Sequence, residues 1–117
     1  FILAHAVLWL QKINYLLDLA DVSGAISLEG FQGSAAPFKV GLHQIRPFKG
    51  SLKVAERMRM LLEGSENLDA HKDCDRVQDP YSIRCIPQVH GASRNAYKHL
   101  KKLTTIELNL VTDNPII

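Results

Sequence analysis

Apolar residues recur at helical spacing through most of the chain. The first run of them falls on one stripe of a helix with 3.6 residues per turn. Its members are Leu3, Ala6, Val7, Leu10, Ile13, Leu17 and Ala20. The stripe predicts an amphipathic helix that ends near Asp21. Asp is a favoured N-cap, so we expect Asp21 to begin a second helix that ends before Gly33. The apolar positions of that helix are Ala25, Ile26, Leu28 and Phe31.

The middle of the chain alternates between breaks and one further helix. Residues 34–50 contain two prolines and two glycines, which predicts a long connection with at most short helical turns. Ser51 is the expected N-cap of a third helix, and Gly64 is its expected stop. The inward positions of this helix are Val54, Ala55, Met58, Leu61 and Leu62. Residues 65–77 are polar and predict a surface loop.

The last helical pattern has alternating steps of three and four residues. It comprises Val89, Ala92, Ala96, Leu103, Ile106 and Leu110. These steps are typical of a bundle seam and predict a helix of about 22 residues, about 33 Å long. No strand alternation and no internal repeat are present. The pattern therefore predicts an all-α fold, with residues 1–117 forming a single helical unit.

Between the surface loop and the last helix lies the segment QDPYSIRCIPQVHGA, residues 78–92. Asp79 is the expected N-cap of a short helix with Pro80 at its first position. Tyr81, Arg84 and Cys85 then share one face, Gln78 stands just ahead of the cap, and Pro87 stops or kinks the helix. An arginine fork suits a carboxylate, and a phenol can pass a proton. Alternatively, Arg84 pairs with a nearby Asp while Tyr81 fills the core. Spacing alone leaves both interpretations open.

Composition narrows the possible partners. With 14 basic and 12 acidic residues, the net charge of +2 gives no field for a polyanion, so we expect no nucleic-acid partner. No run reaches the roughly 20 apolar residues that span a bilayer. The two cysteines favour a reducing cytosol over a disulfide framework. Four candidate metal ligands crowd one polar loop without the paired spacing of a zinc site, and we interpret them as solvated. They are His71, Asp73, Cys74 and Asp75.

Two motifs resemble a known family. VQDPYSIRCIPQVHGA (77–92) and IELNLVTDNPII (106–117) are similar to the aromatic amino acid ammonia-lyases. ISLEGFQGSAAPF (26–38), HQIRPFKGS (43–51) and LLEGSE (61–66) occur in the order and at about the spacing of that family. The resemblance implies that the chain is an internal portion of a longer protein, which agrees with the absence of an initiating Met. It also implies a helical segment of the central domain of a larger helix-bundle lyase fold.

The resemblance carries expectations about chemistry. Members eliminate ammonia from an amino acid and use a protein-derived electrophile, 4-methylidene-imidazol-5-one, formed from an Ala-Ser-Gly triad. By matching positions, Arg84 resembles the carboxylate-binding arginine and Tyr81 the tyrosine beside the electrophile. Gln78 resembles the glutamine that positions substrate, and Asn114 an asparagine that reaches the same pocket. The wording PQVHGA favours members that convert histidine to urocanate in histidine catabolism. Members acting on phenylalanine or tyrosine, including aminomutases, are the alternative. A cytoplasmic homotetramer is implied.

The triad itself is missing from these residues. The nearest match, Val22-Ser23-Gly24, has Val where the triad has a small residue and is too close to the Gln78–Arg84 segment. We interpret it as coincidental, so the polypeptide as written is expected not to catalyse. A non-catalytic helical oligomerisation module is therefore the alternative from a different functional class.

Overall fold

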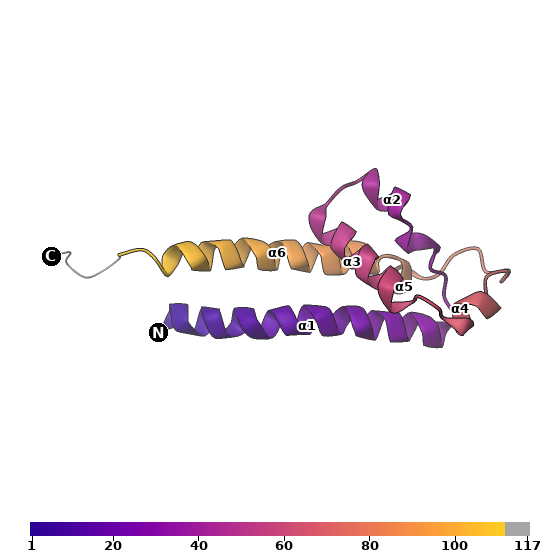
Figure 1. Cartoon of the computed structure of the whole chain (residues 1–117), viewed down its shortest axis with the longest axis horizontal. Coiled ribbons are helices and arrows are strands. Elements are labelled where there is room, and N and C mark those ends of the chain that lie inside the picture. Colours follow the sequence, from indigo (N-terminus) through magenta and orange to yellow (C-terminus); the bar gives the residue numbers. More distant parts are fainter. Residues whose placement is uncertain (112–117) are drawn as a thin grey trace.

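Two long helices set the shape of the molecule. The computed structural model describes residues 1–111, in which α1 (Ile2–Phe31) and α6 (Ile86–Glu107) run antiparallel, side by side (Figure 1). A third helix, α3 (Lys49–Leu61), packs against both. The principal extents are 71 × 27 × 22 Å, so the shape is elongated. Residues 1–111 contain no strand, which confirms the all-α prediction. None of their helices combines the length and apolarity needed to cross a membrane.

Short helices fill the connections. The segment after α1 holds the 3₁₀ helix η1 (Ala36–Phe38) and α2 (Val40–Gln44), as predicted for residues 34–50. The segment predicted as a plain surface loop contains α4 (Glu66–Ala70). It begins where the Ser65 hydroxyl accepts the Leu68 N–H at 3.1 Å, an N-cap that the sequence prediction missed. The last short helix, α5 (Tyr81–Arg84), directly precedes α6.

The core lies where α1, α3 and the start of α6 meet. Its fully buried side chains include Leu28, Phe38, Val54 and Met58. The predicted stripe of α1 is confirmed, because every member is buried or half-buried. The inward face of α3 is confirmed as well, except that Leu61 is 42% exposed.

The predicted break at Asp21 is wrong. α1 continues without interruption to Phe31, and Asp21 lies fully buried inside it. Its carboxylate pairs with Arg57 and Arg94 from other helices and caps nothing. Gly24 lies inside the same helix and allows close packing, because a Cβ there would lie 3.1 Å from the Ile86 side chain.

Two further helix starts differ from the prediction. α3 begins at Lys49 with Phe48 as its N-cap, so Ser51 is a buried first-turn residue. α5 has Pro80 as its N-cap, because the Asp79 carboxylate turns instead to the backbone N–H of Ser34. Pro87 lies in the first turn of α6, where its missing N–H is not needed.

The apolar seam of α6 does not face this core. The helix has the predicted 22 residues. However, all six seam residues are exposed, Val89 by 63% and Leu103 by 45%. The buried positions of α6 are Ile86, Pro87, Gly91 and Thr104. Ile86 and Pro87 at the start of α6 are apolar, but beyond them the buried positions are small or polar, and the apolar seam is left outward.

Gly50 and Gly91 allow α3 and α6 to cross at very short range. A Cβ on Gly50 would lie 2.0 Å from the Gly91 carbonyl oxygen, and a Cβ on Gly91 would lie 2.5 Å from the Ser51 nitrogen. Both obstacles are backbone atoms, which cannot rotate away. The Asn95 amide oxygen accepts the Gly50 N–H at 3.0 Å and holds the same crossing.

We expect Gly91→Ala to lower the free energy of unfolding by about 3 kcal/mol, the upper range for overpacking. Gly41→Ala is the matched control, because a Cβ there meets nothing within 4 Å. Thermal unfolding of both variants checks this. Equal midpoints for the two variants would contradict the close crossing.

Candidate functional site

A pocket of about 460 Å³ lies between the η1–α2 connection and the segment that leads into α6. Gln78 and Arg84 both line it, so the structure brings these two predicted site residues together. The remaining lining residues are Ser34, Ala36, Pro37, Leu42, His43, Val77, Asp79, Cys85 and Gln88. One guanidinium and two side-chain amides thus face a single cavity, a donor set suited to an anionic group.

Arg84 has no carboxylate partner among the described residues. Its Nε is buried and makes no hydrogen bond there. The guanidinium carbon lies 4.1 Å from the centre of the Tyr81 ring, a cation–π contact between residues three apart in α5. The alternative in which Arg84 pairs with an Asp and Tyr81 fills the core is not what these residues form, since Tyr81 is 71% exposed.

Of the other two predicted site residues, the structure describes only Tyr81. Tyr81 lies beside the pocket and contacts it only through Arg84. Asn114 lies outside the described residues, which end at 111. Of the predicted group of Tyr81, Arg84 and Cys85, Arg84 and Cys85 line the pocket and Tyr81 does not, although the Cys85 N–H donates to the Tyr81 carbonyl at 3.0 Å.

Sequence reasoning missed two lining residues, His43 and Gln88. His43 is 4% exposed, and its Nε2 lies 2.9 Å from the Pro37 carbonyl oxygen. A carbonyl only accepts, so Nε2 donates and Nδ1 is the acceptor of the neutral ring. The sequence carried a signal for this placement, because HQIRPFKGS (43–51) is one of the motifs that resemble the family.

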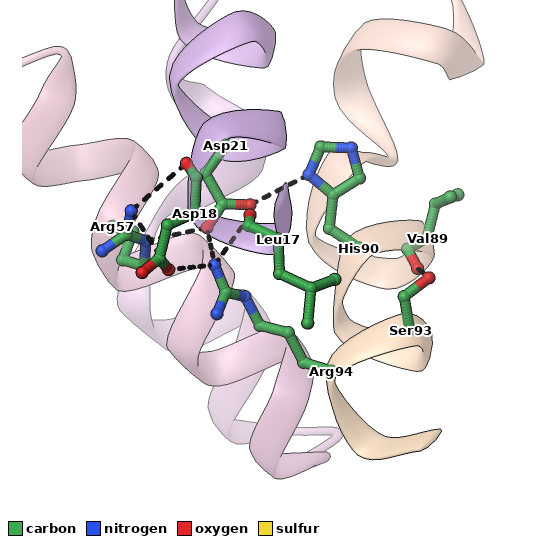
Figure 2. Close-up of polar contacts among 8 residues, drawn as sticks. All are labelled: Leu17, Asp18, Asp21, Arg57, Val89, His90, Ser93 and Arg94. Carbon is green, nitrogen blue, oxygen red and sulfur yellow. Dashed lines mark hydrogen bonds and ion pairs between the residues drawn. The ribbon is translucent and has the colours of Figure 1, made fainter. Parts of the chain in front are cut away.

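A buried charge network ties the three long helices together (Figure 2). Asp21 of α1 accepts from Arg57 Nε of α3 at 2.8 Å, and from His90 Nδ1 of α6 at 2.9 Å. Arg94 of α6 donates to Asp21 and also, at 2.9 Å, to Asp18. Every long helix therefore contributes a charge, which fixes their mutual register.

The network shifts two ionisation equilibria. The hydrogen bond from Arg94, helped by the nearby Arg57 charge, lowers the pKa of Asp18 below its ordinary 3.8. Burial alone would lower the pKa of Arg94, but its hydrogen bonds to Asp18 and Asp21 outweigh burial and raise it. Arg94 is thus held as a cation, and Asp18 as an anion, at neutral pH.

Because the folded pKa of Asp18 is lowered, the stability of the protein depends on pH in the acidic range. The stabilisation from Asp18 is complete above its unfolded pKa and is lost as the pH falls through the lower folded value. We expect Asp18→Asn to lower the thermal midpoint at about pH 6, and the difference to shrink as the pH falls below about 4 toward the lowered folded pKa. Because Asp18 is 44% exposed, added salt should also narrow the difference. A pH-independent difference would contradict this role.

The described residues offer little for a metal or for the electrophile. No three His, Cys, Asp or Glu side chains come together within residues 1–111, and the His71 ring lies 3.1 Å from the Asn67 carbonyl. Val22, Ser23 and Gly24 lie inside α1, where the Ser23 carbonyl accepts the Ser27 hydroxyl at 2.8 Å. Their backbone is committed to helical hydrogen bonds, so they do not fit the cyclised group.

Comparison with known proteins places this geometry in a family. The family model described as aromatic amino acid lyase matches residues 1–117. Histidine ammonia-lyase of Streptococcus pyogenes is 51% identical over 102 residues, covering 87% of this chain and 20% of that protein. Histidine ammonia-lyase of Sorangium cellulosum is 45% identical over 117 residues, covering 100% of this chain and 23% of that protein.

Solved structures agree. Ergothionase of Treponema denticola superposes with a TM-score of 0.88 at 30% identity, over 97% of this chain and 22% of that one. Phenylalanine aminomutase of Pantoea agglomerans gives a TM-score of 0.86 at 30% identity, over 98% of this chain and 26% of that one. The chain spans about a fifth to a quarter of the length of these relatives. On its sequence, its helical fold and this family match, the chain belongs to the aromatic amino acid lyases.

Proposed function

We propose that this chain is the carboxylate-binding part of a histidine ammonia-lyase. The whole protein would eliminate ammonia from L-histidine to give urocanate: the C–N bond breaks, a β-proton leaves and a C=C bond forms. The observation that carries the proposal is Arg84, a guanidinium on a pocket wall with a buried, unpartnered Nε. The similarity to two histidine ammonia-lyases supports histidine as the substrate.

Arg84 would bind the substrate carboxylate with its fork of donors, and Gln78 on the same wall would orient it. Tyr81, whose ring lies against the Arg84 guanidinium, presents an exposed hydroxyl that could hold or transfer a proton. Asn114 would complete the polar set. The electrophile 4-methylidene-imidazol-5-one, supplied by residues outside this chain, would activate the substrate for loss of ammonia.

The exposed apolar faces support a homo-oligomeric protein, and we propose the cytoplasmic tetramer. Five residues of the exposed seam lie along one face of α6, at steps of three, four and seven residues, and Leu8, Trp9 and Tyr15 of α1 are more than half exposed. A single soluble copy rarely leaves so much contiguous apolar surface in water. Other helices of the whole protein, from the same or another subunit, would cover it.

Phenylalanine or tyrosine elimination is the second candidate, because one structural relative is a phenylalanine aminomutase. Assaying the full-length protein with histidine, phenylalanine and tyrosine separates the candidates. We expect ammonia release from histidine with kcat/KM at least about 100-fold above the others, a discrimination of about 2.8 kcal/mol. A preference for phenylalanine, or an isomerised amino acid without ammonia, would favour the second candidate. No turnover of any substrate would favour the non-catalytic oligomerisation module.

A further inference from the structure

Asp79 lies in the sequence between Gln78 and Arg84. Its carboxylate is buried and does not act as the N-cap of α5. Asp79 is 8% exposed, and its Oδ2 accepts the Ser34 backbone N–H at 2.6 Å. Ser34 follows the end of α1, 45 residues earlier in the chain. This hydrogen bond joins the two walls of the pocket that Gln78 and Arg84 line.

Arg76 secures the same junction from the other side. Its Nη1 lies 3.3 Å from Asp79 Oδ1 and 3.4 Å from the Phe31 carbonyl oxygen. Its guanidinium carbon stands 4.4 Å from the centre of the Phe31 ring. The end of α1 is therefore held through both its backbone and a side chain.

The local backbone is shaped to accept the carboxylate. Gln32 adopts the left-handed conformation (φ 56°) that ends α1, and Gly33 follows it, buried. A Cβ on Gly33 would lie 3.1 Å from Asp79 Oδ2 and 3.2 Å from the Leu28 side chain. A side chain at residue 33 would therefore crowd the carboxylate, and glycine leaves room for it.

The geometry points to Asp79 as a positioning residue. It holds Gln78 and Arg84 at a set distance from the opposite pocket wall, Ser34–Pro37, and a substrate carboxylate needs that distance to bind. The inference rests on the proposed function and deepens it. Asp79 also lines the pocket, but its carboxylate oxygens are engaged by the Ser34 N–H and by Arg76, so its role is not to bind the substrate directly. It acts through its two neighbours, because Gln78 precedes it directly and the Pro80 carbonyl after it accepts the Arg84 N–H at 3.0 Å.

The test uses Asp79→Asn in the full-length protein, which keeps the shape but removes the charge. We expect KM for the amino acid to rise about tenfold while kcat changes less than about threefold, since orientation of the carboxylate is what weakens. Gly33→Ala should act in the same direction, because it displaces the same carboxylate. Asp73→Asn is the matched control, an exposed acid of the same loop, and should leave KM unchanged.

A second readout does not depend on turnover. Amide hydrogen exchange at Ser34 and over residues 81–85 should accelerate about tenfold or more in Asp79→Asn and not in Asp73→Asn. Faster exchange with an unchanged KM would overturn the positioning role and leave a purely structural one. Unchanged exchange would overturn the inference outright. If the wild-type protein turns over no amino acid, the proposed function fails by itself, and the exchange result alone decides whether Asp79 holds the segment.

Discussion

Replacing Arg84 with alanine is expected to raise KM for the amino acid by about 100-fold or more, with subunit assembly unchanged. Losing one partner of a desolvated, hydrogen-bonded ion pair costs about 2–5 kcal/mol, and about 2.8 kcal/mol corresponds to 100-fold. Arg84 has no ion-pair partner among residues 1–111 that would make it structural. Steady-state kinetics with size-exclusion chromatography of the same sample measures both properties.

Two variants sharpen this comparison. Arg84→Lys keeps the charge but loses the planar fork, so it should recover only part of the affinity. Arg46→Ala removes an exposed arginine that stacks at 5.8 Å on Phe48 and does not line the Arg84 pocket, so it should leave KM unaltered. An unchanged KM in Arg84→Ala, or equal losses at Arg46 and Arg84, would remove the basis for the carboxylate assignment.

The second large effect is expected at Asp21. Asp21→Asn should destabilise the protein by about 3–5 kcal/mol, the usual cost of removing one partner from a buried charge cluster. The substitution leaves the guanidinium groups of Arg94 and Arg57 without their buried carboxylate partner, and these side chains are only 13% and 25% exposed. Thermal unfolding should show a midpoint far lower than that of Asp18→Asn, since Asp18 is 44% exposed and can be replaced by water.

A compensated variant separates charge from packing. Changing Asp21 to Leu together with Arg57 and Arg94 to Met removes the buried charges and leaves only Asp18 without its arginine partners, where a side chain 44% exposed can be solvated by water. Such replacements are often neutral or stabilising. We expect this triple variant to recover most of the loss of Asp21→Asn. If the triple variant unfolds as readily as Asp21→Asn, the destabilisation comes from something other than the buried cations.

The apolar pattern predicted the helices better than it predicted their contacts. The stripe of α1 and the inward face of α3 could be read from periodicity, because these helices pack against apolar neighbours within the chain. The same logic misplaced α6, whose heptad seam is exposed. Periodicity identifies an apolar face but not its partner. The face that α6 buries contains Gly91, Arg94 and His90, which no hydrophobic pattern marks.

The errors at Asp21 and Asp79 share one cause. Each aspartate precedes a helical pattern and therefore resembled an N-cap. Each carboxylate is instead used by a partner distant in sequence: Arg94 lies 73 residues from Asp21, and Ser34 lies 45 residues from Asp79. Local helix propensity depends on neighbouring residues and cannot predict contacts between residues so distant in the sequence. The proximity of Gln78 and Arg84 was predictable, because it depends on a short segment bounded by prolines.

The most direct test of the account compares two ligands that differ in one group. Binding of histidine and of histamine, which lacks the carboxylate, is measured by calorimetry on full-length protein with and without Arg84→Ala, in both cases kept from turnover by replacing the serine of the electrophile-forming triad. We predict that the wild-type protein prefers histidine by about 100-fold and that the variant binds both ligands alike, a coupling of about 2.8 kcal/mol between Arg84 and the carboxylate. The same preference in both proteins would contradict the claim that this pocket holds an amino acid by its carboxylate.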